Sequence, residues 1–187
     1  MSRVEIARIP GVHSLNSKKI TDERGYFEKF FDKSILESMH LNTGLDSIAL
    51  SSNKVTGTLR GLHFQTFPFA EEKIVVCISG SIFDVVVDLR VESPTYRMWG
   101  ATSLDSEEGK LLYLPKGVAH GFQTLVDNSK VLYAITSKYN LLSAHTLSYS
   151  DTALNISWPL PVSVISNKDE TGVSLEAAVD LWAEITE

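Results

Sequence analysis

Cysteine, basic residues and long apolar runs are all scarce in this 187-residue chain. The single cysteine, Cys77, excludes an internal disulfide and a cysteine-cluster metal site. No apolar run approaches the ~20 residues of a membrane span, and the first residues lack a signal-peptide core, so we expect a cytoplasmic protein with no membrane partner. The 17 basic residues are outnumbered by 23 acidic ones, and the net charge of −6 argues against nucleic-acid binding.

Helix signals are also few, and most of the chain is typical of short strands separated by Gly, Pro, Asn and Asp. Two helices are predicted: Asp32–Met39, with Asp32 as its N-cap, and a C-terminal segment at about 174–185. Two tight turns, Ser79–Ser81 and Asp127–Ser129, predict that the strands flanking each turn pair with one another. Because we find no linker or internal repeat, residues 1–187 are expected to form one mostly β domain, a sandwich or barrel.

Several polar residues stand on strand-like apolar runs, where they call for an explanation. His63 and Arg60 share one run, Lys73 opens the next, and Tyr133 lies in a later one. A base, a cation and a phenol that converge in one barrel could together catalyse proton transfer. Strict alternation puts Arg60 and His63 on opposite faces of their strand, so either Gly61 forms a bulge or Arg60 reaches the site differently, for instance across a dimer.

The segment from Gly109 to His120 fits the spacing G-x5-P-x-G-x2-H, which resembles the second motif of cupin barrels. Its proline and glycines make a turn that would aim His120 into the barrel. The first cupin motif normally supplies two metal-binding histidines as H-x-H, but here the run is His63-Phe64-Gln65. A metal site needs three or more convergent ligands, and two histidines with a weak glutamine favour a metal-free barrel.

Six segments together resemble the dTDP-4-dehydrorhamnose 3,5-epimerase family. They are Asp22–Phe27, Leu59–Gln65, Phe83–Arg90, Ser93–Tyr96, Ala119–Phe122 and Ser166–Asp169. The resemblance extends from about the first strand to Asp169 and leaves out the C-terminal helix. It implies a cupin-type jelly-roll β-sandwich or barrel with a few short helices.

The resemblance also implies an isomerase that needs no cofactor. The family's substrates are nucleotide-diphosphate-linked 4-keto-6-deoxysugars, in which the C4 ketone acidifies the hydrogens on C3 and C5. A base removes one hydrogen to give an enolate, and an acid returns a proton on the opposite face of the sugar, which inverts C3, C5 or both. The resemblance further implies a homodimer in which the two subunits exchange N-terminal strands.

Residue roles follow from the positions that match the family's motifs. His63 is expected to be the base, Asp169 its orienting partner, Lys73 the group that stabilises the enolate oxygen, and Tyr133 the acid on the opposite face. The expected substrate-binding residues are Arg24, Arg60 and Lys168 at the diphosphate, His120 and Tyr139 near the sugar, and Lys29. A lone strand histidine is more often structural than catalytic, and the hypothesis depends on these residues occurring together. His13, His40 and His145 follow no pattern and are interpreted as surface or structural residues.

The departures from the family pattern cluster at nucleotide-binding positions. Lys29 stands where the family usually has a glutamate, Ile48-Ala49-Leu50 replaces a Gln-Asp-Asn run, and Ala144 replaces another glutamate. Apolar side chains cannot replace amide hydrogen bonds to a base. The sequence therefore gives the hypothesis that the proton-transfer chemistry is retained while recognition of the nucleotide is altered, so that the substrate is a non-dTDP sugar nucleotide.

Four alternatives remain open at this point. The enzyme could epimerise C3 alone or C5 alone, or it could be a 3,4-ketoisomerase on a related barrel. A metal-dependent cupin oxygenase and a non-catalytic sugar-binding cupin are the other two. The presence of both His63 and Tyr133 favours epimerisation over movement of the ketone.

Overall fold

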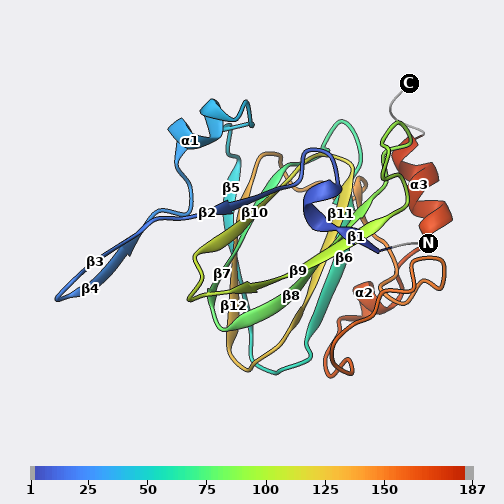
Figure 1. The fold of residues 1–187 in the computed structure, drawn as a ribbon. Coiled ribbons are helices and arrows are strands. Elements are labelled where there is room, and N and C mark those ends of the chain that lie inside the picture. Colours follow the sequence, from blue (N-terminus) through green and yellow to red (C-terminus); the bar gives the residue numbers. More distant parts are fainter. Residues whose placement is uncertain (1–2, 184–187) are drawn as a thin grey trace.

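The computed structural model describes residues 3–183, which form two β-sheets packed face to face (Figure 1). The six-stranded sheet has the order β1 (Arg3–Glu5), β9 (Trp99–Asp105), β8 (Ser81–Asp88), β11 (Val118–Thr124), β6 (Leu59–Gln65), β13 (Ala144–Thr146). The five-stranded sheet has the order β2 (His13–Asn16), β10 (Lys110–Leu114), β7 (Lys73–Ser79), β12 (Ser129–Ile135), β5 (Ser47–Asn53). All pairings in the two sheets are antiparallel except that of β1 with β9. The predicted mostly β jelly-roll sandwich is confirmed.

The two hairpin predictions are wrong. The turn at Gly80 separates β7 from β8 as expected, but these strands lie in different sheets, and the same holds for β11 and β12. The turn signal in the sequence fixes where the chain reverses and does not say which sheet receives the next strand. Crossing to the other sheet lets each strand bury a face against the sheet it has just left.

The core between the sheets is built from alternate residues of the central strands. Val86 of β8, Phe122 of β11 and Val75 of β7 belong to this buried cluster. Cys77 lies in the same cluster, and burial raises the pKa of its thiol to about 11, in keeping with its interpretation as a small buried hydrophobe. The other face of β8 is buried as well, which explains the unbroken apolar run Val85-Val86-Val87 in this strand.

The outer face of the six-stranded sheet is covered by the C-terminal part of the chain. Val179 and Trp182 of helix α3 (Leu175–Ala183) belong to a second buried cluster that also contains Val85 and Val87 of β8, and the Trp182 ring lies 5.4 Å from that of Phe67. This helix lies within the predicted range, although residues 184 and 185 are outside the described part. The short helix α2 (Asn167–Glu170) begins at Ser166, whose hydroxyl accepts a hydrogen bond from the Asp169 N–H.

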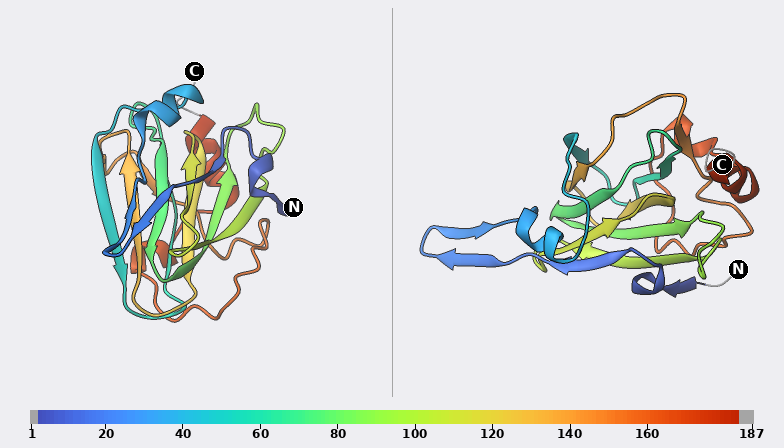
Figure 2. Two further views of the ribbon diagram at one scale, coloured as in Figure 1. Left: turned by 60° about the vertical axis from the view of Figure 1, so that its left-hand side comes forward. Right: turned by 90° about the horizontal axis from the view of Figure 1, so that it is seen from above.

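The N-terminal region carries an arm that leaves the sandwich. Among residues 3–183, strands β3 (Lys19–Asp22) and β4 (Gly25–Glu28) pair only with each other, and the hairpin projects far from the sheets (Figures 1 and 2). Helix α1 (Lys33–Ser38) follows the arm, and Asp32 caps it through a bond from the Ser34 N–H, as predicted. A single 3₁₀ turn, η1 (Ile6–Arg8), joins β1 to the core. No helix in the described part of the chain is long and apolar enough to cross a membrane.

Candidate active site

A bulge in β6 places Arg60 and His63 on the same face of the strand. The ladder with β11 pairs His63 with His120 and Arg60 with Phe122, so three steps along β6 match two steps along β11. Gly61 sits in this irregular stretch at φ +106°, and a Cβ there would lie 2.6 Å from the Gly121 Cα. Strict alternation would put Arg60 and His63 on opposite faces of β6, and the bulge at Gly61 explains how one chain brings both to the same face.

Two adjoining cavities open at this face. The first, the histidine cavity, has a volume of about 260 Å³ and is lined by Ala49, Ser51, Arg60, His63, Lys73, His120, Gly121, Phe122, Tyr133 and Ile135. The second, the lysine cavity, measures about 240 Å³ and is lined by Ser47, His63, Glu71, Lys73, Ile135, Ser137, Tyr139, His145 and Lys168. His63 and Lys73 belong to both walls, so the two cavities adjoin one another at these side chains.

His63 is held by Asp169, as the sequence hypothesis requires. The His63 Nε2 lies 2.7 Å from Oδ1 of Asp169, and Oδ2 of the same carboxyl accepts a bond from the Gly61 N–H. Burial alone raises the pKa of Asp169, but the bonds from His63, Gly61 and Ser166 outweigh it, and the net pKa is below the usual range. An ionised carboxylate can only accept hydrogen bonds, so the proton of neutral His63 sits on Nε2 and Nδ1 is free as a base.

A second histidine–carboxylate pair reaches the wall of the histidine cavity through His120. The His120 Nε2 lies 2.8 Å from Oδ2 of Asp84, and both side chains are buried. Burial raises the pKa of Asp84 even though His120 beside it acts in the opposite direction. The other carboxyl oxygen, Oδ1, has no hydrogen-bond partner among the described residues. The His120 ring meets Tyr133 edge-on at a centroid distance of 6.2 Å.

Tyr133 reaches the histidine cavity from the opposite sheet. It lies on β12, whereas His63 and His120 lie on β6 and β11 of the six-stranded sheet. Burial raises the pKa of Tyr133, and the nearby Asp84 carboxylate raises it further. The phenol therefore keeps its proton at neutral pH and can donate it.

Lys73 and Arg60 supply positive charge to the cavity walls. The Lys73 Nζ lies 2.7 Å from Oε1 of Glu71, and both side chains are largely buried. Arg60 donates a hydrogen bond from Nε to Oδ1 of Asn53 at 2.7 Å. Its two terminal nitrogens have no hydrogen-bond partner among the described residues. A guanidinium anchored in this way presents paired donors to an anion.

Tyr139 and Lys168 form the outer wall of the lysine cavity. The Lys168 ammonium lies 5.9 Å from the centroid of the Tyr139 ring, and both side chains are exposed. An aromatic face and a cation together suit a nucleotide, because the ring can stack on a base and the ammonium can meet a phosphate.

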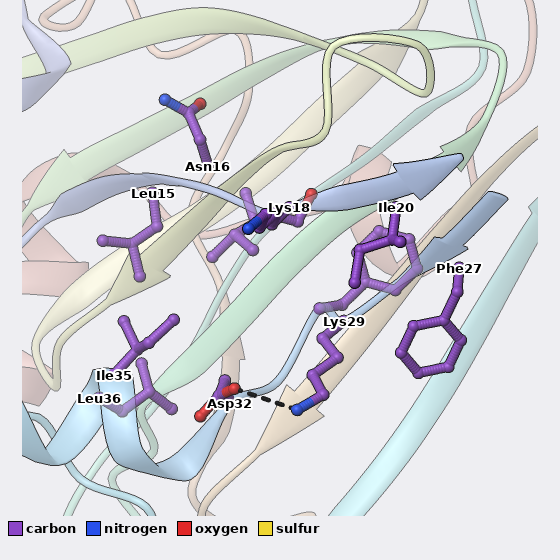
Figure 3. A pocket seen from close by; sticks show the side chains of 12 residues that line it. Leu15, Asn16, Lys18, Ile20, Phe27, Lys29, Asp32, Ile35 and Leu36 are labelled. Atoms are coloured by element: carbon purple, nitrogen blue, oxygen red, sulfur yellow. Dashed lines mark hydrogen bonds and ion pairs between the residues drawn. The ribbon is translucent and has the colours of Figure 1, made fainter. Parts of the chain in front are cut away.

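Arg24 and Lys29 are not brought to these cavities. Arg24 lies at the tip of the arm, paired with Asp22 and 88% exposed. Lys29 lies at the base of the arm and pairs with Asp32 at 3.5 Å (Figure 3). It lines a separate apolar hollow of about 240 Å³ between the arm and α1, in which Ile20, Phe27 and Ile35 are exposed. Within one chain, neither Arg24 nor Lys29 lines these cavities, because the arm carries both of them outward, and their role in substrate binding stays a prediction.

Strand β5 changes the interpretation of the Ile48-Ala49-Leu50 departure. Ala49 and Ser51 line the histidine cavity, whereas Ile48 and Leu50 are 66% and 56% exposed. Alternation on an edge strand produces this arrangement, since Ser47, Ala49 and Ser51 share one face. Of the three replaced positions, only Ala49 contributes to a cavity wall within the chain.

The sequence interpretation missed His145 and Glu71. His145 lies in the wall of the lysine cavity, with its ring 5.4 Å from that of Phe64. Burial lowers the pKa of His145, and the Lys168 charge lowers it further. The position of His145 depends on the pairing of β13 with β6, which sets His145 beside Phe64 and Thr146 beside His63. No local pattern encodes this pairing of segments about 80 residues apart.

The residues that metal cupins use as ligands are engaged in other contacts. His63 and His120 each pair with a carboxylate. Gln65 donates hydrogen bonds to Phe69, Glu71 and Lys138 and accepts one from the Asn140 N–H. In the described part of the chain, no three His, Cys, Asp or Glu side chains are placed to hold a metal ion.

Comparison with known proteins yields one consistent family. The family model described as dTDP-4-dehydrorhamnose 3,5-epimerase matches residues 7–177. A protein of that name from Sinorhizobium fredii is 39% identical over 168 residues, which cover 89% of this chain and 86% of the relative. A dTDP-4-dehydrorhamnose 3-epimerase from Streptomyces niveus is 34% identical, with coverage of 92% and 83%.

The fold agrees with this assignment. The crystal structure of RmlC from Legionella pneumophila, described as a dTDP-6-deoxy-D-glucose-3,5-epimerase in complex with dTDP-4-keto-L-rhamnose, superimposes with a TM-score of 0.87. It is 32% identical in sequence, and the match covers 93% of each chain. The chain described here belongs to the dTDP-4-dehydrorhamnose 3,5-epimerase family.

Proposed function

We propose that this protein is a cofactor-independent epimerase that inverts C3 and C5 of a dTDP-linked 4-keto-6-deoxysugar, with the whole chain acting as one domain. The main support is that His63 and Tyr133 line one cavity from opposite sheets, and that Asp169 holds His63 in place. Inversion of a carbon centre needs a base on one face of the sugar and an acid on the other.

Each step uses a group whose position supports it. Nδ1 of His63 takes the hydrogen from the carbon next to the ketone, and the Asp169 carboxylate stabilises the imidazolium that forms. The Lys73 ammonium meets the negative charge that develops on the ketone oxygen, with His120 beside the sugar. Tyr133 then delivers its proton to the opposite face of the carbon. Arg60 and Lys168 bind the diphosphate. Tyr139, which the sequence was expected to place near the sugar, lies beside Lys168 and packs against the nucleotide end instead.

The working form is a homodimer in which the arm of one copy reaches the cavities of the other. Arg24 matches a substrate-binding position of the family and Lys29 occupies another, where the family usually has a glutamate, but neither residue lines the cavities of its own chain. The arm also presents exposed Ile20, Tyr26 and Phe27, which a monomer would leave in water. A second copy would cover these side chains and use both cations.

Nuclear magnetic resonance in D₂O tests the reaction. Incubation of the protein with a dTDP-linked 4-keto-6-deoxyhexose should place deuterium at C3 and C5 while the C4 ketone persists. Movement of the ketone to C3 would contradict epimerisation. Deuterium at C3 alone would identify a C3-epimerase, the second candidate, which the named activity of the Streptomyces niveus relative favours.

The nucleotide is tested separately by titration of dTDP, UDP, GDP and CDP into the protein. We expect dTDP to bind most tightly, because Ile48 and Leu50 point away from the cavities and leave their inner walls unchanged. A preference for another nucleoside diphosphate would instead support the altered-recognition hypothesis and assign it to Ala49.

A further inference from the structure

Gln65 is the residue that stands where metal-binding cupins carry a second histidine, and its side chain is buried. Its amide nitrogen lies 3.0 Å from the Phe69 carbonyl, 3.0 Å from Oε2 of Glu71 and 3.1 Å from the Lys138 carbonyl. Its amide oxygen accepts a bond from the Asn140 N–H at 2.8 Å. One side chain thus ties the segment that precedes β7 to the loop that carries Tyr139.

Glu71 continues this connection to the cavity. One carboxylate oxygen accepts from Gln65, and the other lies 2.7 Å from the Lys73 Nζ. Glu71 and Lys73 are each only 12% exposed at the side chain, so water screens their attraction weakly. The contacts therefore run without a break from the Tyr139 loop through Gln65 and Glu71 to Lys73.

Lys73 gains a fixed position from this arrangement. A lysine ammonium is a point charge on a flexible four-carbon stem, and holding it in one place costs rotamer entropy. Stabilisation of an enolate oxygen depends on a donor that is already in place when the charge develops. A carboxylate that is itself locked by Gln65 removes that cost before substrate arrives.

We propose that Glu71 and Gln65 are positioning residues: Glu71 fixes the Lys73 ammonium at the enolate oxygen, and Gln65 aligns Glu71 with the Tyr139 loop. The inference rests on the proposed epimerase function. It predicts different effects for the two residues. Glu71 is bonded to Lys73, whereas Gln65 is bonded both to Glu71 and to the loop that carries Tyr139.

The matched control is the neighbouring carboxylate. Glu72 carries the same charge one residue further on and lines neither cavity; its backbone N–H donates to Thr136. Glu71→Gln keeps the size of the side chain but loses one of its two bonds, because its amide group must face a donor either at Lys73 or at Gln65. Glu71→Asp keeps the charge but is one methylene too short to bridge both partners.

Three measurements on the full-length protein test the proposal. They are the rate of deuterium incorporation into the sugar, the affinity for dTDP, and the rate of Lys73 acetylation by acetic anhydride, measured by peptide mapping against the other lysines. For Glu71→Gln we expect incorporation to slow about tenfold, Lys73 to be acetylated several-fold faster, and dTDP affinity to stay within about twofold. Gln65→Leu should slow incorporation and also weaken dTDP binding, and Glu72→Gln should change none of the three.

The proposal is overturned if Glu71→Gln leaves incorporation and acetylation at wild-type values, or if Glu72→Gln reproduces its effects. Should Glu71→Gln unfold, as judged by circular dichroism, the same comparison is made with Glu71→Asp. If the wild-type protein incorporates no deuterium, the proposed function fails, and the acetylation rates still decide whether Glu71 fixes Lys73.

Discussion

His63 Nε2 and Asp169 Oδ1 lie 2.7 Å apart although the two residues are separated by 106 positions in the chain. The carboxylate comes from the short helix α2, which Ser166 caps, and the imidazole comes from β6. This contact decides which ring nitrogen of His63 is free to act as a base.

Replacement Asp169→Asn should slow epimerisation by roughly three orders of magnitude, because the amide can donate to Nε2 and favour the wrong tautomer. Deuterium incorporation measures the loss. Glu170→Gln, an exposed neighbour on the same helix, should retain wild-type activity. Equal activity of Asp169→Asn and wild type would remove Asp169 from the mechanism.

Tyr133→Phe should uncouple exchange from inversion. Without the phenol, His63 can still remove a hydrogen and return deuterium to the same face of the carbon, so the recovered sugar should carry deuterium with its original configuration. We expect the ratio of inverted product to exchanged substrate to fall about 100-fold. Tyr149→Phe, outside both cavities, serves as the control. Normal inversion by Tyr133→Phe would assign the acid to another group.

The dimer model predicts that two inactive variants rescue one another. Arg24→Ala removes a cation from the arm, and His63→Ala removes the base from the barrel. In a mixed dimer, one site carries both defects and the other carries neither, so co-expression of the two variants should restore activity to a sizeable fraction of wild type. If neither co-expressed nor refolded mixtures regain activity while each variant is folded and dimeric, the arm does not complete the partner's site.

The glycine pair at the bulge should not tolerate a methyl group. A Cβ on Gly121 would lie 2.5 Å from the Arg60 carbonyl oxygen, and one on Gly61 would lie 2.6 Å from the His120 carbonyl oxygen. Either alanine variant should destabilise the fold by roughly 2 kcal/mol and displace His63, which would lower activity at least tenfold. Gly44→Ala, whose Cβ would meet only the Asn42 side chain at 3.3 Å, should have the same free energy of unfolding as wild type. Chemical denaturation measures the difference.

Asp88 should make stability fall in acid. Burial raises its pKa, but bonds from Arg90, Ser93 and Thr95 outweigh this and set the net pKa below the usual range. The carboxylate therefore stabilises the fold above its unfolded pKa of about 4, and that contribution is lost as the pH falls through the lower folded pKa. Asp88→Asn should cost roughly 2 kcal/mol at pH 7.

The difference between Asp88→Asn and wild type should begin to shrink below about pH 4, where the unfolded chain takes up the proton, and should disappear below the lower folded pKa, where the folded wild-type carboxyl is protonated as well. Asp180→Asn on the exposed face of α3 should show no such dependence. A difference that stays constant from pH 7 to pH 3 would mean that the charge of Asp88 contributes nothing.

Local features of this fold could be predicted because they depend on neighbouring residues. The Asp32 cap, the chain reversals at Gly80 and near Asn128, and the C-terminal amphipathic helix follow from side chains a few positions apart. The partner strands of β8 and β12 could not be predicted in this way, because sheet pairing depends on which distant segments bury complementary faces.

By itself, the sequence determined the chemical inventory of the site: an imidazole, an ammonium, a phenol and guanidinium groups in motifs that match one epimerase family. Only the tertiary structure decided how these groups are used. The extra residue at Gly61 turned Arg60 to the side of His63, the arm took Arg24 away from its own cavity, and Glu71 came to hold Lys73. The physical reason is that side-chain chemistry is fixed residue by residue, whereas direction and pairing are set by strand register and by contacts between segments far apart in the chain.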